Sequence, residues 1–349
     1  MSSKVARADA GKESFGTVLV AGSANVDFVA RASHVPRPGE TVLGRDFAIF
    51  PGGKGANQAV ACARAGGVPT RMVLALGEDV FAPLIEGSLR DAGVELHVVR
   101  VAAAATGAAL ICVADDAQNA ITVAPGANSL LRTVDQRDLA GVGYLLLQLE
   151  TPLETVIDIA RAAHAAGVKV VLNAAPARPL PDELLDVIDV LIVNEDELTR
   201  VTGHGGSIAQ RLESVRVPLV IVTLGQRGCC ARHGREFFLQ PSFRVKSVDT
   251  TSAGDTFCGV LGASLCSKVT LAQALRRASA AAALATTRIG AQSSIPTYDE
   301  VEALMHSNGG SRGNNDTSAL ATYCQLADYY GTQALQCALS NQAPSGESA

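Results

Sequence analysis

Tryptophan is absent from this 349-residue chain, and phenylalanine and tyrosine bring the aromatic content to only 4%. Hydrophobic residues nevertheless make up 48% of the sequence. The core must therefore be built mainly from Ala, Val, Leu and Ile. Such a composition is typical of buried parallel strands covered by alanine-rich helices.

Long apolar runs are also missing. The longest, at 217–224 and 278–285, are far shorter than the roughly 20 residues that cross a bilayer. The first 16 residues are polar and charged, and the apolar stretch after them is too short for the apolar region of a signal peptide. We therefore expect a cytoplasmic protein that does not contact a membrane, with a flexible N-terminal segment over 1–16.

The sequence has no strongly basic segment and no Cys-x-x-Cys pair. Its 29 Lys and Arg against 34 Asp and Glu give a net charge of −5, without a run of five like charges, so nucleic acid is not an expected partner. The 8 cysteines fall mostly in apolar segments, which is typical of reduced thiols in a cytosolic protein.

Short apolar runs alternate with amphipathic patterns along most of the chain, which predicts an α/β fold with a mainly parallel sheet between helices. The expected strands are 18–21, 72–76, 144–149, 169–172, 190–193 and 219–223, and the expected helices are 55–65, 83–92, 153–166 and 182–187.

Two regions break this rhythm, since about 38–50 and 107–124 read as strands without an intervening helix. We expect them to form a small antiparallel sheet that acts as a lid over the main domain at 17–305. Residues 306–316 read as a polar linker, 319–339 has helical character, and the role of the extension 306–349 stays unassigned.

One turn has the composition of an anion site. The segment Asp249–Phe257 leads from a strand into an apolar helix through small residues. The N–H groups of Ala253, Gly254 and Asp255 can point at one spot there, where the helix dipole favours negative charge. The alternative is an ordinary helix cap by Ser252 or Asp255.

Two further segments combine glycine or small residues with polar side chains. In Pro51–Asn57, glycines permit a ligand to approach the backbone closely, but Lys54 is followed by Gly55, so the segment is not a Walker A loop. Its alternative is a tight turn with a solvated lysine. Asn25 and Asp27 follow the first strand and suit vicinal hydroxyls, without the glycine fingerprint of a dinucleotide site.

Asn194 and Glu197 follow another apolar run. A carboxylate and an amide three residues apart at a helix start can organise hydrated Mg²⁺, or they can simply cap the helix. Thr223–Gly228 reads, by itself, as a hairpin turn.

In order and spacing, these motifs resemble the ribokinase family, within the larger group of carbohydrate kinases that includes fructokinases and adenosine kinase. The markers are Gly52–Ala59, Leu147–Glu150, Asn173–Ala177, Asn194–Glu197, Thr223–Gly225 and Asp249–Phe257. The resemblance covers roughly residues 17–305. The lysine in Gly-Gly-Lys-Gly-Ala-Asn favours the ribose branch.

The resemblance implies a role for each matching position. Asp255 would be the catalytic base, with Ser252, Ala253 and Gly254 forming the anion hole. The sugar, D-ribose by this resemblance, would contact Asn25, Val26, Asp27, Gly53, Lys54, Gly55, Ala56, Asn57, Glu150 and Asp255. ATP and its Mg²⁺ would contact Asn194, Glu197, Thr223, Leu224, Gly225, Gln226, Arg227, Gly228, Gly254, Asp255 and Ser279.

A site for K⁺, an activating monovalent cation, would use Asp249, Thr251, Ala285, Arg288, Gly290 and Ser294, largely through carbonyls. The family is commonly a homodimer. Position 279 departs from the pattern, because serine stands where the bacterial enzymes usually carry histidine. Two alternatives stay open: a related kinase for deoxyribose, fructose or a nucleoside, and a non-catalytic sensor on the same fold.

Overall fold

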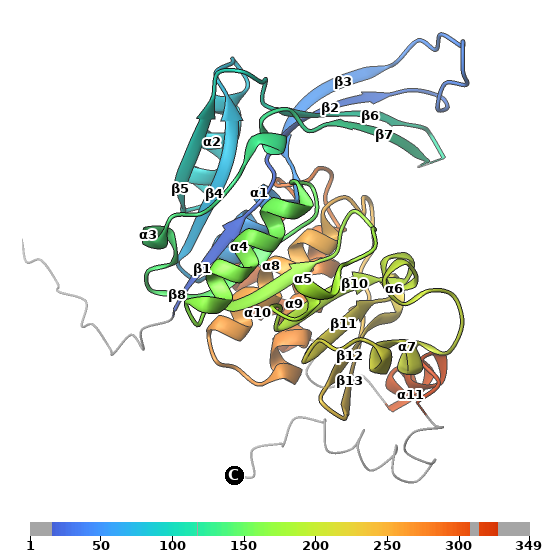
Figure 1. The fold of residues 1–349 in the computed structure, drawn as a ribbon. Coiled ribbons are helices and arrows are strands. Elements are labelled where there is room, and N and C mark those ends of the chain that lie inside the picture. Colours follow the sequence, from blue (N-terminus) through green and yellow to red (C-terminus); the bar gives the residue numbers. More distant parts are fainter. Residues whose placement is uncertain (1–15, 117, 308–313, 327–349) are drawn as a thin grey trace, which may run out of the picture.

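The computed structural model describes residues 16–116, 118–307 and 314–326 (Figure 1). A nine-stranded sheet runs through the main body, with helices on both faces. In spatial order its strands are β13 (Glu236–Pro241), β12 (Gly228–His233), β11 (Leu219–Thr223), β10 (Val190–Asn194), β9 (Lys169–Asn173), β8 (Val142–Leu147), β1 (Thr17–Ala21), β4 (Thr70–Gly77) and β5 (Val94–Val101).

In this spatial order, every neighbouring pair between β11 and β5 is parallel. β12 and β13 add an antiparallel hairpin at the β11 edge. Successive side chains of a strand point to opposite faces, so β1 serves two cores. Val18 and Val20 belong to one core, and Leu19 and Ala21 belong to the other. The predicted α/β fold is confirmed, and its core is mainly aliphatic.

Different helices cover the two faces. The first core contains residues of α1 (Lys54–Val60), the π-helical turn Ala61–Ala65, α2 (Ala82–Asp91), α8 (Ala253–Cys266), α9 (Leu271–Ala285) and α10 (Tyr298–Ser307). The second contains residues of α3 (Gln136–Leu139), α4 (Leu153–Ala165), α5 (Asp182–Leu185), α6 (Glu195–Thr202), α7 (Ile208–Ser214) and α11 (Asn314–Tyr323). No helix of the described residues is long and apolar enough to cross a membrane.

A separate four-stranded sheet projects from the main body and is called the lid sheet here (Figure 1). Its order is β3 (Asp46–Gly52), β2 (Asn25–Arg31), β6 (Gly107–Val113) and β7 (Asn119–Ala124). A small second sheet is confirmed, but three details differ from expectation. Residues 38–45 form no strand, β2 is an additional member, and β2 pairs with β6 in parallel, so the sheet is mixed.

The end of the chain also differs from the sequence interpretation. Residues 306 and 307 complete α10, and residues 314–316 already belong to α11, so the predicted linker is at most the stretch 308–313, which lies outside the described residues. The predicted helix 319–339 begins earlier, at Asn314, and its part beyond residue 326 also lies outside them.

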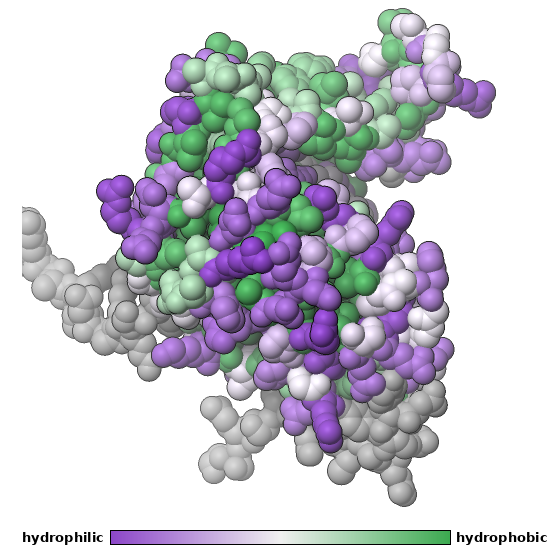
Figure 2. Space-filling model, viewed as in Figure 1, coloured by the Kyte–Doolittle hydropathy of each residue, from purple (hydrophilic) through white to green (hydrophobic). Residues whose placement is uncertain are grey.

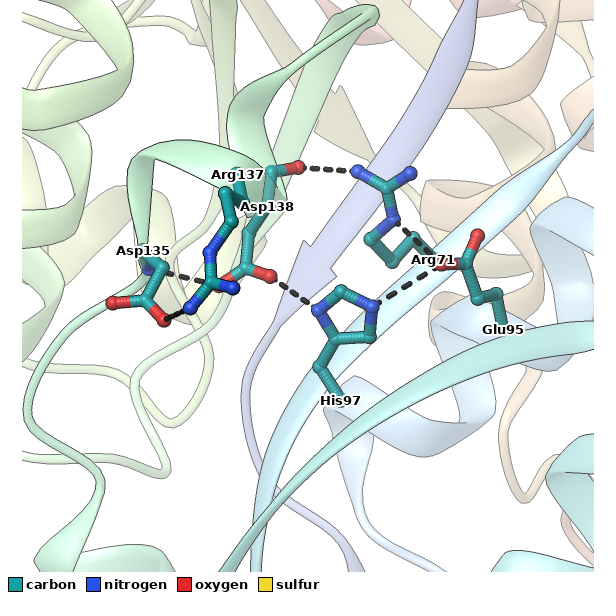
Figure 3. A network of polar contacts seen from close by, with 6 residues as sticks. All are labelled: Arg71, Glu95, His97, Asp135, Arg137 and Asp138. Carbon is teal, nitrogen blue, oxygen red and sulfur yellow. Dashed lines mark hydrogen bonds and ion pairs between the residues drawn. The ribbon is translucent and has the colours of Figure 1, made fainter.

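A polar network ties α3 to the far edge of the large sheet (Figure 3). His97 on β5 bridges the Asp138 and Glu95 carboxylates through its two ring nitrogens. Arg71 on β4 donates to the Asp138 carbonyl at 2.6 Å and pairs with Glu95 at 3.3 Å. None of these side chains lines either of the two cavities of about 240 and 740 Å³, so we assign the network a structural role.

Candidate active site

The predicted functional segments converge at the carboxyl ends of the central strands. Chain segments leaving β1, β8, β10 and β11 meet the N-termini of α1 and α8 there. Ligands of open α/β sheets bind at this edge. The fold therefore brings together motifs that are separated by more than 200 residues in the sequence.

The turn before α8 keeps amide groups available. Ser252 adopts a left-handed φ of 60°, and its hydroxyl donates to the Ala291 carbonyl at 3.3 Å instead of capping the helix. Side-chain capping, the alternative interpretation, does not occur. The Ala253 N–H donates to Thr250 at 3.3 Å, and no acceptor among the described residues takes the N–H of Gly254 or Asp255. These two amides suit a phosphate oxygen.

Asp255 is held in a fixed orientation inside the first turn of α8. One carboxylate oxygen accepts from Asn57 at 3.0 Å and the other accepts from Gln58 at 3.1 Å. The Gln58 amide also donates to Asn173 at 3.1 Å and accepts from Gln148 at 2.6 Å. Each Asp255 oxygen keeps a further lone pair, so the carboxylate can still accept a proton or hydrogen bond.

A second carboxylate, Asp27, lies at the base of the lid sheet. Burial, followed by the charges of Glu150 and Asp255, raises its pKa to about 7. No donor among the described residues hydrogen-bonds this carboxylate, and the buried Asn57 Oδ1 also has no partner. These are acceptors that a polyhydroxylated ligand can satisfy.

Lys54 and Glu150 complete the charged cluster. The Lys54 pKa is raised, chiefly by the negative charge of Asp255, so the ammonium stays protonated. Glu150 accepts hydrogen bonds from the Ser23 hydroxyl at 2.6 Å and from the Lys54 backbone N–H at 3.1 Å. The carboxylate of Glu150 thus connects the end of β8 to the start of α1.

Gly53 is required by the local geometry. Its φ is +89°, and an added Cβ would lie 2.7 Å from the Asn25 nitrogen. Only glycine adopts this conformation at low cost and allows α1 to begin against β2. The glycine-rich segment therefore brings Lys54 and Asn57 next to Asn25 and Asp27. The tight turn of the alternative interpretation is present, but Lys54 is half-buried and lines a cavity instead of lying on the open surface.

Two cavities flank the Gly254 turn. The smaller, of about 240 Å³, is lined by residues that include Lys54, Asn173, Asn194, Glu197, Gly254 and Asp255. The larger, of about 740 Å³, lies between the β11–β12 connection and α9. Both are lined by Thr223, Thr250 and Gly254, so the cavities adjoin at the helix N-terminus.

Most of the positions predicted for the nucleotide line the larger cavity, namely Thr223, Gly225, Gln226, Gly228, Gly254 and Ser279. Asn194, Glu197 and Asp255 line the smaller one. Leu224 is buried, and the Arg227 guanidinium lies 4.2 Å above the Tyr323 ring, so these two side chains point elsewhere. Thr223–Gly228 is also the hairpin connection that the sequence suggested.

Asn194 and Glu197 form a reciprocal cap at the start of α6. The Glu197 N–H donates to Asn194 Oδ1 at 2.7 Å, and the Asn194 N–H donates to Glu197 Oε2 at 2.8 Å. The capping interpretation is therefore correct. Glu197 also faces the smaller cavity, and burial is the main cause that raises its pKa. Its second oxygen fits a hydrated divalent cation.

The predicted cation positions form one loop cluster beside α8. Asp249 accepts from the Thr251 N–H at 2.9 Å and from the Gly290 N–H at 3.0 Å. Burial acts to raise the Asp249 pKa, but these hydrogen bonds lower it overall. The carbonyls of Thr251, Arg288 and Gly290 accept no hydrogen bond from any described residue. An oxygen-only donor set of this kind fits a hard cation.

Five other predicted positions have less freedom. The Ala285 carbonyl accepts from the Arg288 N–H at 3.4 Å, and the Ser294 hydroxyl donates to the Ala291 carbonyl at 2.8 Å. Val26 and Ala56 are buried in the first core, so only their backbones can reach a ligand. Gly55 packs against Ser23, where an added Cβ would lie 2.7 Å from its backbone.

Comparison with known proteins identifies the family. Residues 16–298 match the model of the pfkB family carbohydrate kinases. This chain belongs to the pfkB family. Among curated relatives, ribokinase from Haemophilus influenzae is 39% identical over 83% of this chain and 99% of its own length.

Solved structures agree with this assignment. Ribokinase from Thermotoga maritima superposes with a TM-score of 0.78 at 36% identity, covering 84% of this chain and all of that one. Arabidopsis thaliana ribokinase, solved with ribose and ATP, gives 0.77 at 35% identity, over 83% of this chain and 98% of that one. As a pfkB family carbohydrate kinase, the chain is an ATP-dependent sugar kinase.

Some residues of this pfkB family site were not predicted. Gln58 and Asn173 lay inside the quoted markers but received no role, and Gln148 likewise stands between Leu147 and Glu150. Asn128 was missed entirely, although it donates to Asn25 Oδ1 at 2.8 Å. Gln58 could have been predicted, because a glutamine interrupts an otherwise apolar, alanine-rich helix pattern. Nothing in the sequence near Asn128 indicates its contact with Asn25.

Proposed function

We propose that this carbohydrate kinase transfers the γ-phosphoryl group of ATP to O5 of D-ribose. One observation carries the proposal: the oriented Asp255 carboxylate and two unpaired amides stand together where the two cavities adjoin. A hydroxyl on one side and a triphosphate on the other would meet there. The ribose assignment draws on the ribokinases from H. influenzae and T. maritima and on the Arabidopsis ribokinase solved with ribose and ATP.

Asp255 has the role of general base. As O5 attacks the γ-phosphorus, its proton passes to the Asp255 carboxylate, an O5–P bond forms, and the bond from the γ-phosphorus to the bridging oxygen of ADP breaks. Hydrogen bonds from Asn57 and Gln58 aim the carboxylate before the reaction begins. The Gly254 and Asp255 amides stabilise the charge on the transferring group.

The sugar would lie between the base of the lid sheet and α1. Asp27 and Asn57 offer acceptors without partners, and the Lys54 ammonium and Asn25 side chain add polar groups nearby. Buried acceptors of this kind reject a ligand that lacks the matching hydroxyl. Lid closure over the sugar would exclude water and limit ATP hydrolysis.

The nucleotide would occupy the larger cavity, with its phosphates directed to the α8 turn. Its walls near α9 are small residues, Ser279, Ala282 and Ala283, which leave room for a flat base. Serine at position 279 has a hydroxyl that lies 3.9 Å from the Cys229 sulfur. Because this hydroxyl is directed toward Cys229 and the neighbouring wall residues are alanines, adenine recognition would depend more on the shape of the cavity than on the side chain at position 279.

Two cations complete the proposal. Glu197, with Asn194, would hold the water shell of Mg²⁺, which neutralises phosphate charge when bound. The Asp249, Thr251, Arg288 and Gly290 oxygens, with Ser294 and the Ala285 carbonyl, would hold K⁺. Because Gly290 bonds Asp249 and Ser252 bonds Ala291, this loop is linked directly to the anion turn.

We further propose a cytoplasmic homodimer that associates through the lid sheets. Large apolar side chains of the lid are exposed, among them Phe47 at 64%, Leu110 at 58% and Ile121 at 54%. Figure 2 shows apolar surface gathered over the lid sheet and the adjacent β4–β5 region. A second copy of the sheet would cover such a patch.

A sugar panel in a coupled ADP-release assay tests the substrate. Ribose should give the highest kcat/KM, above 2-deoxyribose, fructose and adenosine, and phosphorus NMR of the product should show a 5-phosphate. Higher kcat/KM for deoxyribose or for a nucleoside would assign the related kinase activity instead. Absence of turnover with every sugar, despite ATP binding, would favour a non-catalytic sensor.

A further inference from the structure

The last described segment of the chain, residues 316–326, packs onto the nucleotide half of the protein (Figure 1). It is called the docked segment here. Leu320, Cys324 and Leu326 are each at most 2% exposed and belong to the second core together with Leu224 and Phe237. The Cys324 carbonyl also accepts from the Ala209 N–H at 3.3 Å. The docked segment is therefore part of the folded body.

Tyr323 connects the docked segment to two walls of the proposed nucleotide site. Its hydroxyl donates to Glu195 at 2.6 Å, in the first turn of α6 beside Asn194. Its ring lies 4.2 Å below the Arg227 guanidinium, in the turn that carries Gly225 and Gln226. One side chain thus fixes the position of α6 relative to the β11–β12 connection.

Asp316 makes a third connection at the rim of the larger cavity. Both of its carboxylate oxygens accept from Arg244, at 3.0 and 3.2 Å. Arg244 lines that cavity, so its guanidinium is oriented by a residue outside the catalytic region. Both contacts come from the same Arg244 nitrogen, Nη2, so Asp316 holds one arm of the guanidinium at the cavity rim.

The docked segment lies outside the part of the chain that the family shares. The match to the pfkB family ends at residue 298, and the H. influenzae enzyme aligns over 99% of its length with only 83% of this chain. These contacts are consequently additions to the common fold rather than elements of it.

We propose that the docked segment is a positioning element for ATP: Tyr323 holds the Gly225–Arg227 turn, and Asp316 holds Arg244, in the arrangement that accepts the nucleotide. The inference rests on the proposed nucleotide cavity. It implies that perturbing Tyr323 changes nucleotide affinity while the sugar site and the transfer step keep their properties. Tyr323 and Asp316 act through other residues and are not catalytic.

Point variants test this better than truncation, because removing the docked segment would uncover Leu224 and Phe237. Tyr323→Ala should raise KM for ATP and Kd for ADP about two- to fivefold, the loss expected for one exposed cation–π contact. Its kcat and KM for ribose should stay within about 1.5-fold of wild type. Tyr323→Phe, which keeps the ring over Arg227, should give a smaller increase.

Tyr298→Ala is the matched control. Tyr298 on α10 has the same 38% exposure as Tyr323 and also carries an arginine, Arg277, over its ring at 5.3 Å. It lines neither cavity, so its loss should leave both nucleotide constants unchanged. ADP affinity is measured by calorimetry, with folding checked by melting.

The inference is overturned if folded Tyr323→Ala binds ADP like the wild type, or if its ribose KM rises by the same factor as its ATP KM. Ala283→Phe separates this failure from that of the proposed function, because Ala283 lines the larger cavity. If Ala283→Phe weakens ADP binding while Tyr323→Ala does not, only the docked-segment inference fails. If neither variant alters binding, the nucleotide cavity itself is wrong, and the inference fails with it.

Discussion

The proposed contact between Asp27 and the sugar predicts how sugar binding depends on pH. Its carboxylate is buried close to Glu150 and Asp255, and these effects raise its pKa from 3.8 to about 7. The ionised carboxylate offers acceptors on both oxygens, whereas protonation converts one of them to a donor. Acidification below pH 7 should therefore remove the form that binds the sugar hydroxyls.

The magnitude follows from the ionised fraction. With a pKa of about 7, Asp27 is roughly 90% ionised at pH 8 and roughly 10% ionised at pH 6. If only the ionised form binds, the apparent Kd scales with the inverse of this fraction. The Kd for ribose should then rise about tenfold between pH 8 and pH 6.

The same shift gives a stability prediction with a definite sign. A carboxyl whose folded pKa is raised contributes stability that is fully present below pH 3.8 and is lost as pH rises through 7. The upper limit is about 4 kcal/mol, at about 1.4 kcal/mol per pKa unit. Without ligand, Asp27→Asn should therefore gain stability relative to wild type as pH rises from 4 to 8.

Calorimetric titration of ribose without nucleotide is the appropriate assay, because it removes the titration of ATP itself. Asp27→Asn serves as the comparison and should bind ribose weakly, with a Kd that is the same at pH 6 and pH 8. Equal wild-type Kd values at the two pH values would refute the reasoning. So would a tenfold pH dependence that persists in Asp27→Asn.

Three further predictions concern other parts of the molecule. Gly53→Ala should lower the free energy of unfolding, measured with denaturant, by about 1–3 kcal/mol, because the φ of +89° and the close Asn25 nitrogen exclude a side chain. It should also raise the KM for ribose, and an unchanged ribose KM would contradict this prediction. After thorough removal of K⁺, activity should be restored more by added K⁺ than by added Na⁺, because most of the proposed ligands are carbonyl oxygens, which suit the larger ion. Equal rates in the two salts would exclude that site. His97→Leu should lower the free energy of unfolding by about 1–3 kcal/mol, since it leaves the buried Asp138 carboxylate without its histidine partner. A loss of kcat with unchanged stability would contradict the structural role of the network.

Periodicity predicted the central strands well, because parallel strands buried on both faces are continuous apolar runs. All six predicted strands lie in the large sheet. The edge strand β5 was missed because half-exposed Val94–Val101 mixes charged and apolar residues. β12 was not among the expected strands because glycine, two cysteines and arginine give no clear strand pattern, although the hairpin turn suggested at Thr223–Gly228 implies a strand there.

Short motifs predicted the site segments, since glycine and small residues at strand ends have a direct physical reason. Sequence could not indicate that Asn25–Arg31 leaves the main sheet to join the lid, because that depends on pairing with β3 and β6. The contacts of the docked segment were equally invisible, since Tyr323 reaches Glu195 and Arg227 only through the tertiary fold.

The role of Asp255 is the central claim, and kcat of Asp255→Asn tests it most directly. Asparagine keeps the size of the side chain but cannot accept the O5 proton during transfer. We expect kcat to fall about 10²–10⁴-fold, or roughly 3–5 kcal/mol of transition-state stabilisation, with KM for ribose and for ATP changing much less. Asp27→Asn, which neutralises the other buried carboxylate, should mainly raise the ribose KM and serves as the control. An Asp255→Asn enzyme that is folded and turns over within about threefold of wild type would contradict the account.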